Sequence, residues 1–355
     1  MKFCDGSMTK VERFDSICQG DHMDAAKDTI FLEDVNIEGF KSFSEKTNMS
    51  FQPGIGVIIG NNGVGKSNIL DAIVWAIGED DLSRLRCHDY EELFFSGSKD
   101  YPPANRIRIE LNFRKGDQKT GEIVQLVREM TKDGLNHYLI QEKPCEQDTY
   151  RRKLGQLNMK HSLKTIVRQE QINDMILLSP HLRFQRIASL FDTDLNNDLP
   201  KRLLERIGLL FREYLRYLMP KSEGCLRMHT RNGKQELDIE VAFSKYRIRK
   251  AHQLSGGEKS IASLALKLAV FNQLESPFYL LDEVEPSLDY TNHKSMQALL
   301  KSVASHRQLI MITHLRSTIE LANTLHGVRT RWDGSSFMKF YFVMDKRLLR
   351  LYKCC

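Results

Sequence analysis

The residues of this chain best suited to chemistry are a lysine and a serine at the end of a glycine-rich segment. GNNGVGKS, residues 60–67, fits the pattern G-x-x-x-x-G-K-[ST], with Gly60, Gly65, Lys66 and Ser67 in the fixed positions. In such a loop the backbone N–H groups bind phosphate, the lysine reaches the β- and γ-phosphates, and the serine hydroxyl binds Mg²⁺. The pattern therefore predicts a nucleoside triphosphate site. The remaining residues that we expect at the nucleotide are Asn61, Asn62, Gly63, Val64 and Asn68.

A strand and a helix must flank this loop if it is to bind phosphate, and the sequence predicts both. Residues 55–59 (IGVII) form an apolar run typical of a buried strand. Residues 67–77 place Ile69, Ile73 and Ile77 on one face of a helix. The N-terminus of that helix would direct its N–H groups and its dipole at a bound anion.

Two carboxylates and a histidine in the second half of the chain suit phosphate hydrolysis. Asp282 and Glu283 end the segment PFYLLDE, and His314 ends LIMITH. Asp282 is suited to binding Mg²⁺, directly or through water, and Glu283 to activating the attacking water. Since ligands collect at the carboxyl ends of parallel strands, we expect these side chains to lie near the phosphate loop.

A third segment, LSGGEKS at residues 254–260, opens a long helix with a buried apolar face. Its N-terminus could bind a second anion through Ser255, Gly256, Gly257 and Glu258. A plain helix N-cap is the alternative interpretation of the same residues.

Composition narrows the class of protein. The 355 residues leave room for one large α/β domain or two smaller ones, and no apolar run approaches the roughly 18 to 20 residues of a membrane span. None of the seven cysteines forms a C-x-x-C pair, which argues against zinc and for reduced thiols. A net charge of +6 permits nucleic-acid binding without requiring it.

The pattern along the chain predicts four segments. They are a flexible extension at 1–28, a first α/β half with the phosphate loop at 29–180, short helical segments at 181–219 and a second α/β half at 220–355. Predicted strands cover 31–37, 47–51, 106–113, 122–130, 136–141, 225–230 and 235–243. Predicted helices cover 181–191 and 200–218.

The order of these motifs resembles the ABC-type ATPases, and their details resemble the heads of structural maintenance of chromosomes (SMC) proteins. The similar segments include IEGFKSF, KSNILDAIVWAIGE, IVRQEQIND, LSGGEKSIASLALKLAVF and PFYLLDEVEPSLD. The resemblance runs from about residue 30 to 330 and implies an α/β P-loop head with mixed sheets and a helical subdomain.

The resemblance also implies a role for each matching residue. Gln169 would sense Mg²⁺ and the γ-phosphate, so that Ser67, Gln169 and Asp282 form the metal set. Glu283 would polarise water, and His314 would monitor the γ-phosphate. Five further residues carry over. Ser255–Gly257 would cap the triphosphate of a second head, Arg86 would lie near the nucleotide, and Asp289 would lie at the dimer interface.

The implied activity is slow hydrolysis of ATP with Mg²⁺ by two engaged heads, identical or different. The implied partners are DNA, bound without sequence preference, and a kleisin-type bridging protein. The implied location is the chromosome, in a nucleus or a bacterial cytoplasm.

The chain departs from the SMC pattern in two places. It lacks the sustained heptads of long coiled-coil arms, and it carries Glu285 and Pro286 after the carboxylate pair. A RecF-like recombination ATPase is a second interpretation. An ABC transporter subunit is a third, although Lys66 and Gln169 stand 103 positions apart, more than is usual in that class.

Overall fold

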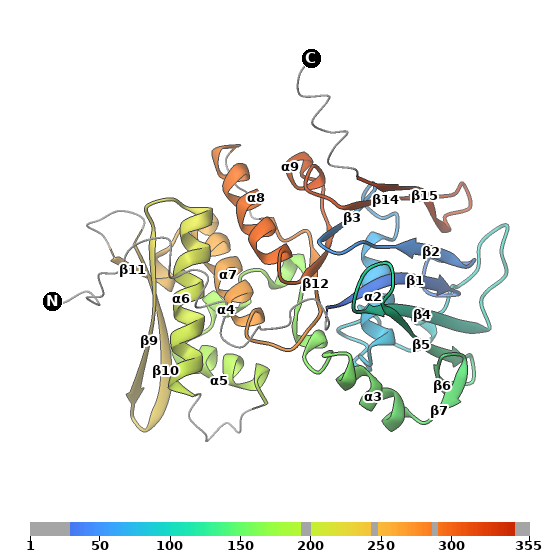
Figure 1. Ribbon diagram of the computed structural model, residues 1–355, viewed down its shortest axis with the longest axis horizontal. Helices are drawn as coiled ribbons and strands as arrows, with labels where there is room; N and C mark the ends of the chain where they lie inside the picture. Colours follow the sequence, from blue (N-terminus) through green and yellow to red (C-terminus); the bar gives the residue numbers. More distant parts are fainter. Residues whose placement is uncertain (1–28, 193–199, 243–247, 286–289, 345–355) are drawn as a thin grey trace, which may run out of the picture.

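A computed structural model of the chain describes residues 29–192, 200–242, 248–285 and 290–344. The predicted extension at 1–28, Pro286, Asp289 and the basic tail lie outside the described residues. The fold is α/β, as predicted. Figure 1 shows the strands of the larger sheets on one side of the molecule, and helices with a small sheet on the other.

A six-stranded central sheet carries the predicted site. Strands β14, β3, β13, β12 and β8 run parallel, and β15 pairs antiparallel with β14 at one edge. The strands in spatial order are β15 (Ser336–Val343), β14 (Thr324–Thr330), β3 (Ile55–Ile59), β13 (Gln308–Ile312), β12 (Phe278–Asp282) and β8 (Ile166–Val167). Strands β3 and β8 come from the first half of the chain, and the other four strands come from the second half. The two halves of the chain therefore share one sheet.

Both faces of this sheet are covered, which explains why its strands read as continuous apolar runs. Each face of the sheet packs against its own hydrophobic core. In β12, Tyr279 and Leu281 belong to the first core, whereas Phe278 and Leu280 belong to the second core on the opposite face. The side chains alternate between the cores because successive residues of a strand point to opposite faces.

The second core lies between the central sheet and an antiparallel six-stranded sheet. That sheet consists of β2 (Thr47–Ser50), β1 (Ile30–Glu38), β4 (Arg106–Lys115), β5 (Glu122–Thr131), β6 (Asn136–Ile140) and β7 (Lys143–Cys145). Helix α2 (Lys66–Ala76) belongs to this core and is buried along most of its length. Helix α3 (Gln147–Gln156) packs beside β6, with Tyr150 and Leu154 buried.

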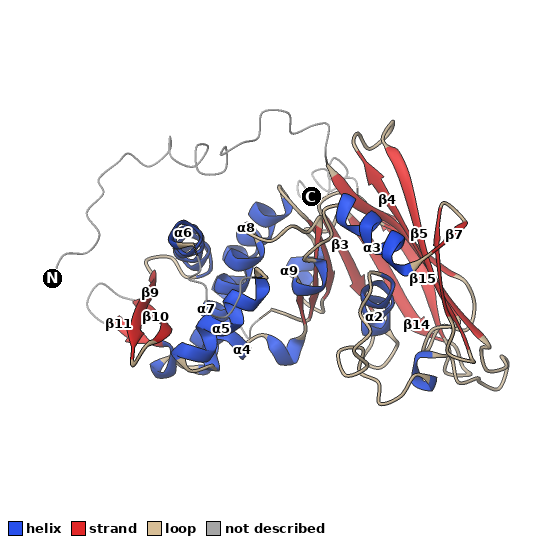
Figure 2. Ribbon diagram, turned by 90° about the horizontal axis from the view of Figure 1, so that it is seen from below, coloured by secondary structure: helices blue, strands red, loops and turns tan. Residues whose placement is uncertain are grey.

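The first core joins the central sheet to a helical lobe. Its helices are α4 (Asp174–Leu177), α5 (Pro180–Leu190), α6 (Lys201–Leu218), α7 (Gly256–Phe271), α8 (Tyr290–Ala304) and α9 (Arg316–Ile319). A small antiparallel sheet covers this lobe, formed by β11 (Ile248–Lys250), β10 (Lys234–Ala242) and β9 (Glu223–Arg231). Figure 2 shows this small sheet at the far end from the large sheets, with the helices between. Helix α6 turns Leu204, Ile207, Phe211 and Leu215 inward at helical spacing.

The predicted strands and helices are present within a few residues of their expected bounds. The hairpin of β5 and β6 turns at residues 132–135, as expected. The elements without a sequence prediction include β7, β8, β11, α3 and the short helices α4 and α9. Strand β8 has two residues, too few for any periodic signal. Among the described residues, no helix is long and apolar enough to cross a membrane.

Candidate nucleotide-binding site

The phosphate loop lies between the end of β3 and the start of α2, as predicted. Gly63 and Gly65 have φ of 79° and 93°, in the left-handed region that favours glycine. A Cβ at Gly65 would lie 2.4 Å from the Ser336 hydroxyl and 2.5 Å from that of Ser42. The sequence thus needs glycine here for both conformation and space. The stretch Asn61–Gly63 is exposed, so the loop is open to a ligand.

Lys66 lies under this loop with 5% of its surface exposed. Its ammonium donates hydrogen bonds of 2.9 Å to the carbonyls of Gly60 and Asn61 and lies 3.9 Å from Glu283 Oε1. Burial lowers the pKa of Lys66, and the charges of Glu283 and Asp282 act in the opposite direction. A buried cation beside open backbone N–H groups fits a bound phosphate.

Ser67 and Asp282 form the oxygen pair expected of a Mg²⁺ site. Asp282 ends β12, has 8% of its surface exposed, and lies beside the Ser67 hydroxyl, which acts to lower its pKa. Burial raises the pKa of Asp282, which means that ionising this carboxyl is costly in the protein alone. A divalent cation held by the two oxygens would offset that cost, so these residues fit Mg²⁺.

Glu283 and His314 meet at the ends of the adjacent parallel strands β12 and β13. Glu283 Oε1 and His314 Nε2 are 2.9 Å apart, with 28% and 46% of the two side chains exposed. The backbone N–H of Glu283 donates to the Ile312 carbonyl at 3.0 Å, although Glu283 has a left-handed φ of 49°. Such strain persists only where neighbouring structure fixes it. The carboxylate is therefore held in place but remains within reach of water.

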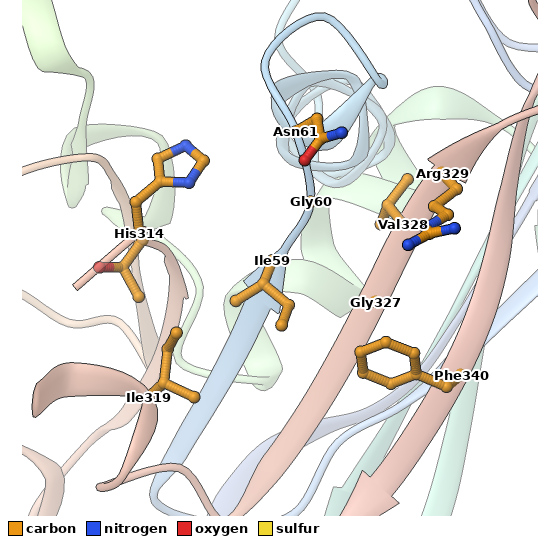
Figure 3. Close-up of a pocket in the computed structure, with 10 residues that line it drawn as sticks. Ile59, Gly60, Asn61, His314, Ile319, Gly327, Val328, Arg329 and Phe340 are labelled. Atoms are coloured by element: carbon orange, nitrogen blue, oxygen red, sulfur yellow. The ribbon is translucent and has the colours of Figure 1, made fainter. Parts of the chain in front are cut away.

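A cavity of about 300 Å³ opens beside the loop at this edge of the sheet. Figure 3 shows His314 on one side of Ile59, and Val328 with Arg329 on the other. Gly60 and Asn61 line the same cavity. A larger cavity of about 870 Å³, lined in part by Asn68, lies beside the N-terminus of α2 and offers room for the rest of a nucleotide.

Gln169 reaches the same edge of the sheet from β8. Val167 of β8 is paired with Leu281 of β12, which precedes Asp282. Gln169 follows two residues later, at the start of a 3₁₀ turn (Gln169–Gln171), and is exposed. The predicted metal set therefore comes from the first turn of α2 (Ser67), the end of β12 (Asp282) and the 3₁₀ turn after β8 (Gln169).

Ser255 and Glu258 lie elsewhere, at the N-terminus of α7. The Ser255 hydroxyl accepts from the Glu258 N–H at 3.4 Å, and the Glu258 carboxylate accepts from the Ser255 N–H at 2.8 Å. The two residues form a capping box, the alternative that the sequence left open. Helix α7 belongs to the first core and the phosphate loop to the second, across the central sheet. The structure thus separates Ser255, Gly256, Gly257 and Glu258 from the loop of their own chain and leaves the first three exposed.

Asp71 is a site residue that sequence reasoning missed. This α2 carboxylate is fully buried and binds three cations: Lys41 at 2.6 Å, Arg86 at 2.6 Å and Arg168 at 2.7 Å. Arg86, expected near the nucleotide, also donates to Asn68 of the loop at 3.2 Å. Because Arg168 immediately precedes Gln169, Asp71 connects the phosphate-loop helix to the glutamine segment. The sequence offered one signal for this cluster, an acidic residue in the phosphate-loop helix of a chain with Lys41 and Arg168 unassigned and Arg86 expected near the nucleotide.

The fold and the site together define a P-loop nucleotide-binding head of the ABC type. The chain belongs to the RecF/RecN/SMC family, because the model of the RecF/RecN/SMC N terminal domain matches residues 31–336. The expectation of an SMC-type head is thereby confirmed.

Individual relatives agree with this assignment. The chain is 38% identical over 114 residues to the Chromosome partition protein Smc of Fusobacterium nucleatum, a match covering 31% of this chain and 10% of the relative. The corresponding protein of Mycolicibacterium paratuberculosis is 29% identical over 157 residues, covering 43% and 13%. The chain thus spans about a tenth of the curated relatives that it matches.

Solved heads match over nearly their whole length. An SMC head domain from Thermotoga maritima has a TM-score of 0.65 and 29% identity, covering 88% of this chain and 99% of that one. An Smc head bound to the C-winged helix domain of ScpA has a TM-score of 0.77 and 27% identity, covering 90% and 99%.

Proposed function

We propose that this chain binds ATP with Mg²⁺ and hydrolyses it slowly when two heads engage. One observation carries the proposal: Lys66, Ser67, Asp282, Glu283 and His314 converge at one edge of the central sheet although they come from distant parts of the sequence. At this edge Lys66 can bind phosphate, Ser67 and Asp282 can bind the metal ion, and Glu283 can bind the attacking water.

The residues divide the chemistry between them. The N–H groups of residues 60–67 and the Lys66 ammonium hold the phosphates. Ser67, Asp282 and Gln169 hold Mg²⁺, which when bound neutralises charge on the phosphate oxygens. Glu283 accepts a proton of the attacking water on a carboxylate oxygen, and His314 fixes the orientation of that carboxylate.

A second head completes the site in this proposal. The N-terminus of α7, with Ser255, Gly256 and Gly257, is exposed and lies away from the loop of its own chain. A helix N-terminus of this kind suits the γ-phosphate held by another copy or by a related head.

The biological role that we propose is chromosome maintenance, with DNA bound through its phosphate backbone and a kleisin-type protein as bridging partner. The support is the family, the relatives named chromosome partition protein, and the solved head bound to a ScpA domain. The chain has a net charge of +6. Two basic residues that could contact DNA are already paired: Arg249 with Glu258 at 3.0 Å and Lys250 with Asp238 at 3.2 Å. These two side chains are therefore less available to DNA phosphates than unpaired cations would be.

A Glu283→Gln variant tests the proposal directly. The amide cannot accept the proton, so hydrolysis should stop while ATP binding persists. Light scattering coupled to gel filtration should show a dimer with ATP and Mg²⁺ and a monomer without them. Adding Ser255→Arg should block the dimer and leave ATP binding by one head intact. A monomer under all conditions in the Glu283→Gln protein would overturn the two-head site.

A further inference from the structure

The buried side of the phosphate loop contacts a serine from the far end of the described chain. Ser336 begins β15 and is 1% exposed. Its hydroxyl donates a hydrogen bond to the Val64 carbonyl, inside the loop, at 2.9 Å. A Cβ at Gly65 would lie 2.4 Å from the same oxygen, so the loop backbone runs directly against this serine. Ser336 thus makes a specific contact with the loop across 272 positions of the sequence.

A second serine connects Ser336 to the start of α2. The Ser42 hydroxyl lies 2.7 Å from that of Ser336 and accepts a hydrogen bond of 2.8 Å from the Asn68 side chain. The backbone joins the same two segments, because the Ser336 N–H donates to the Ser42 carbonyl at 2.7 Å. Val64 and Asn68, on either side of the turn into α2, are therefore attached to one pair of hydroxyls.

The turn between β14 and β15, which precedes Ser336, is fixed by contacts that do not involve the loop. Arg331 lies 2.8 Å from the Glu45 carboxylate, in the segment before β2. Asp333 accepts a hydrogen bond of 2.6 Å from the Ser98 hydroxyl. Since two other segments hold this turn, the position of Ser336 is set before any nucleotide binds.

The hydrogen bond to Val64 orients a whole peptide unit of the loop. The Val64 C=O and the Gly65 N–H belong to one planar trans peptide, so they point in opposite directions. Gly65 has a left-handed φ of 93°, and a glycine offers little steric resistance to rotation of this peptide plane. Fixing the carbonyl on the buried side therefore directs the N–H to the open side, where phosphate would bind.

We propose that Ser336 is a positioning residue for nucleotide binding, which directs the Gly65 N–H toward the phosphates by holding the Val64 carbonyl. The inference rests on the proposed function and deepens it, because it assigns part of the phosphate site to the hairpin of β14 and β15. Ser336 itself touches no phosphate. Backbone N–H groups bind an anion more tightly when they converge before the anion arrives, so a fixed peptide plane favours affinity.

Calorimetry with ADP and Mg²⁺ on the full chain tests this role. ADP carries the phosphates that the loop backbone holds, and it needs no second head. Ser336→Ala removes the donor and should weaken ADP binding at least about fivefold, the equivalent of one net hydrogen bond. Ser336→Cys retains a side chain of similar size with a weak donor, and it should weaken ADP binding as well.

The peptide unit itself can be observed, because Val64–Gly65 is the only Val–Gly pair in the sequence. With ¹³C in the valine carbonyls and ¹⁵N in the glycines, an HNCO spectrum contains one peak, from the Val64 carbonyl carbon and the Gly65 amide. In the nucleotide-free state this peak should differ in position between Ser336→Ala and the original chain. A serine that only stabilises the fold would leave the peak where it is.

Ser222→Ala is the matched control, because Ser222 is also buried and donates to a backbone carbonyl, that of Leu215 in the helical lobe at 3.2 Å. It should leave ADP affinity and the Val64–Gly65 peak unchanged.

Three results would overturn the positioning role and leave the proposed function standing. The first is unchanged ADP affinity in folded Ser336→Ala and Ser336→Cys proteins. The second is an equal loss of affinity in Ser222→Ala. The third is a loss confined to Ser336→Ala, which would mean that the side chain fills space and that its hydrogen bond is not required. An original chain that binds neither ADP nor ATP would overturn the proposed function, and this inference with it.

Discussion

Replacement of His326 by phenylalanine should make the protein more resistant to mild acid. His326 lies in β14, is fully buried, and has its ring between Phe51 at 4.6 Å and Tyr341 at 5.0 Å. Burial lowers the pKa of His326 from 6.5 to about 4, because the charged ring loses its hydration, while the backbone of Ser50 acts weakly in the opposite direction. Phenylalanine retains the ring contacts and cannot be protonated.

The sign and size of the effect follow from this shift. Between pH 6.5 and about 4 the unfolded chain binds a proton at His326 that the folded chain does not, so stability falls as pH falls through that window. Above about pH 7.5 the residue contributes almost nothing to the pH dependence, because both states are then deprotonated. The total loss below pH 4 is about 3 kcal/mol, and the part between pH 7.5 and 5.5 is about 1.3 kcal/mol.

Urea unfolding followed by circular dichroism at pH 7.5, 6.5 and 5.5 measures this difference. The free energy of unfolding of His326→Phe minus that of the original chain should rise by about 1.3 kcal/mol over this range, with unchanged m-values. His137→Phe, at an exposed position of β6, should show almost no such change. A difference for His326→Phe that does not vary with pH would mean that the ring is protonated or hydrated in the folded state, and the reasoning would fail.

Three further outcomes are expected. Lys66→Ala should abolish ATP binding in calorimetry, because the phosphates lose the buried ammonium beside the loop; unchanged affinity would contradict the phosphate-loop assignment. Asp71→Ala should lower the free energy of unfolding by about 3 to 5 kcal/mol, since three cations lose a fully buried partner. Asp238→Ala, on the small sheet, should lower it far less. Similar losses in the two variants would refute the role of Asp71 as the buried partner of these cations. Duplex DNA should bind without sequence preference, and at least roughly tenfold more weakly in 200 mM than in 50 mM salt; salt-independent binding, or none at low salt, would refute the proposed backbone contact.

The sequence predicted those parts of the site whose signal lies within a few neighbouring residues. Residues 60–67 and the pair Asp282–Glu283 each combine a buried strand with a polar ending, so fold and chemistry could be inferred together. The position of Glu283 and His314 at one edge of the sheet also followed, because parallel strands end together, whereas their mutual contact was not predicted. At Ser255 the structure shows the capping box, one of the two interpretations of LSGGEKS, and anion binding by the same helix N-terminus stays a prediction.

Contacts between distant residues could not be predicted. Asp71 meets Arg168 across 97 positions, and Lys267 of α7 meets Asp174 of α4 at 2.6 Å within the helical lobe. Charged residues at helical spacing usually face solvent, so nothing in the local pattern indicates that these are buried. Their partners are set by how β8, η3 (Gln169–Gln171) and α7 pack, which depends on tertiary structure and not on local propensity.

The position of β3 in the central sheet has a consequence for how the polypeptide folds during synthesis. Its neighbours on both sides, β13 and β14, come from the last quarter of the described chain. Until they leave the ribosome, β3 would have two unpaired edges of N–H and C=O groups, the kind of surface that invites pairing with another chain. The phosphate loop at the end of β3 consequently acquires its shape late. Chains truncated before residue 330 should accumulate as chaperone clients or aggregates and not as half-sized nucleotide-binding domains.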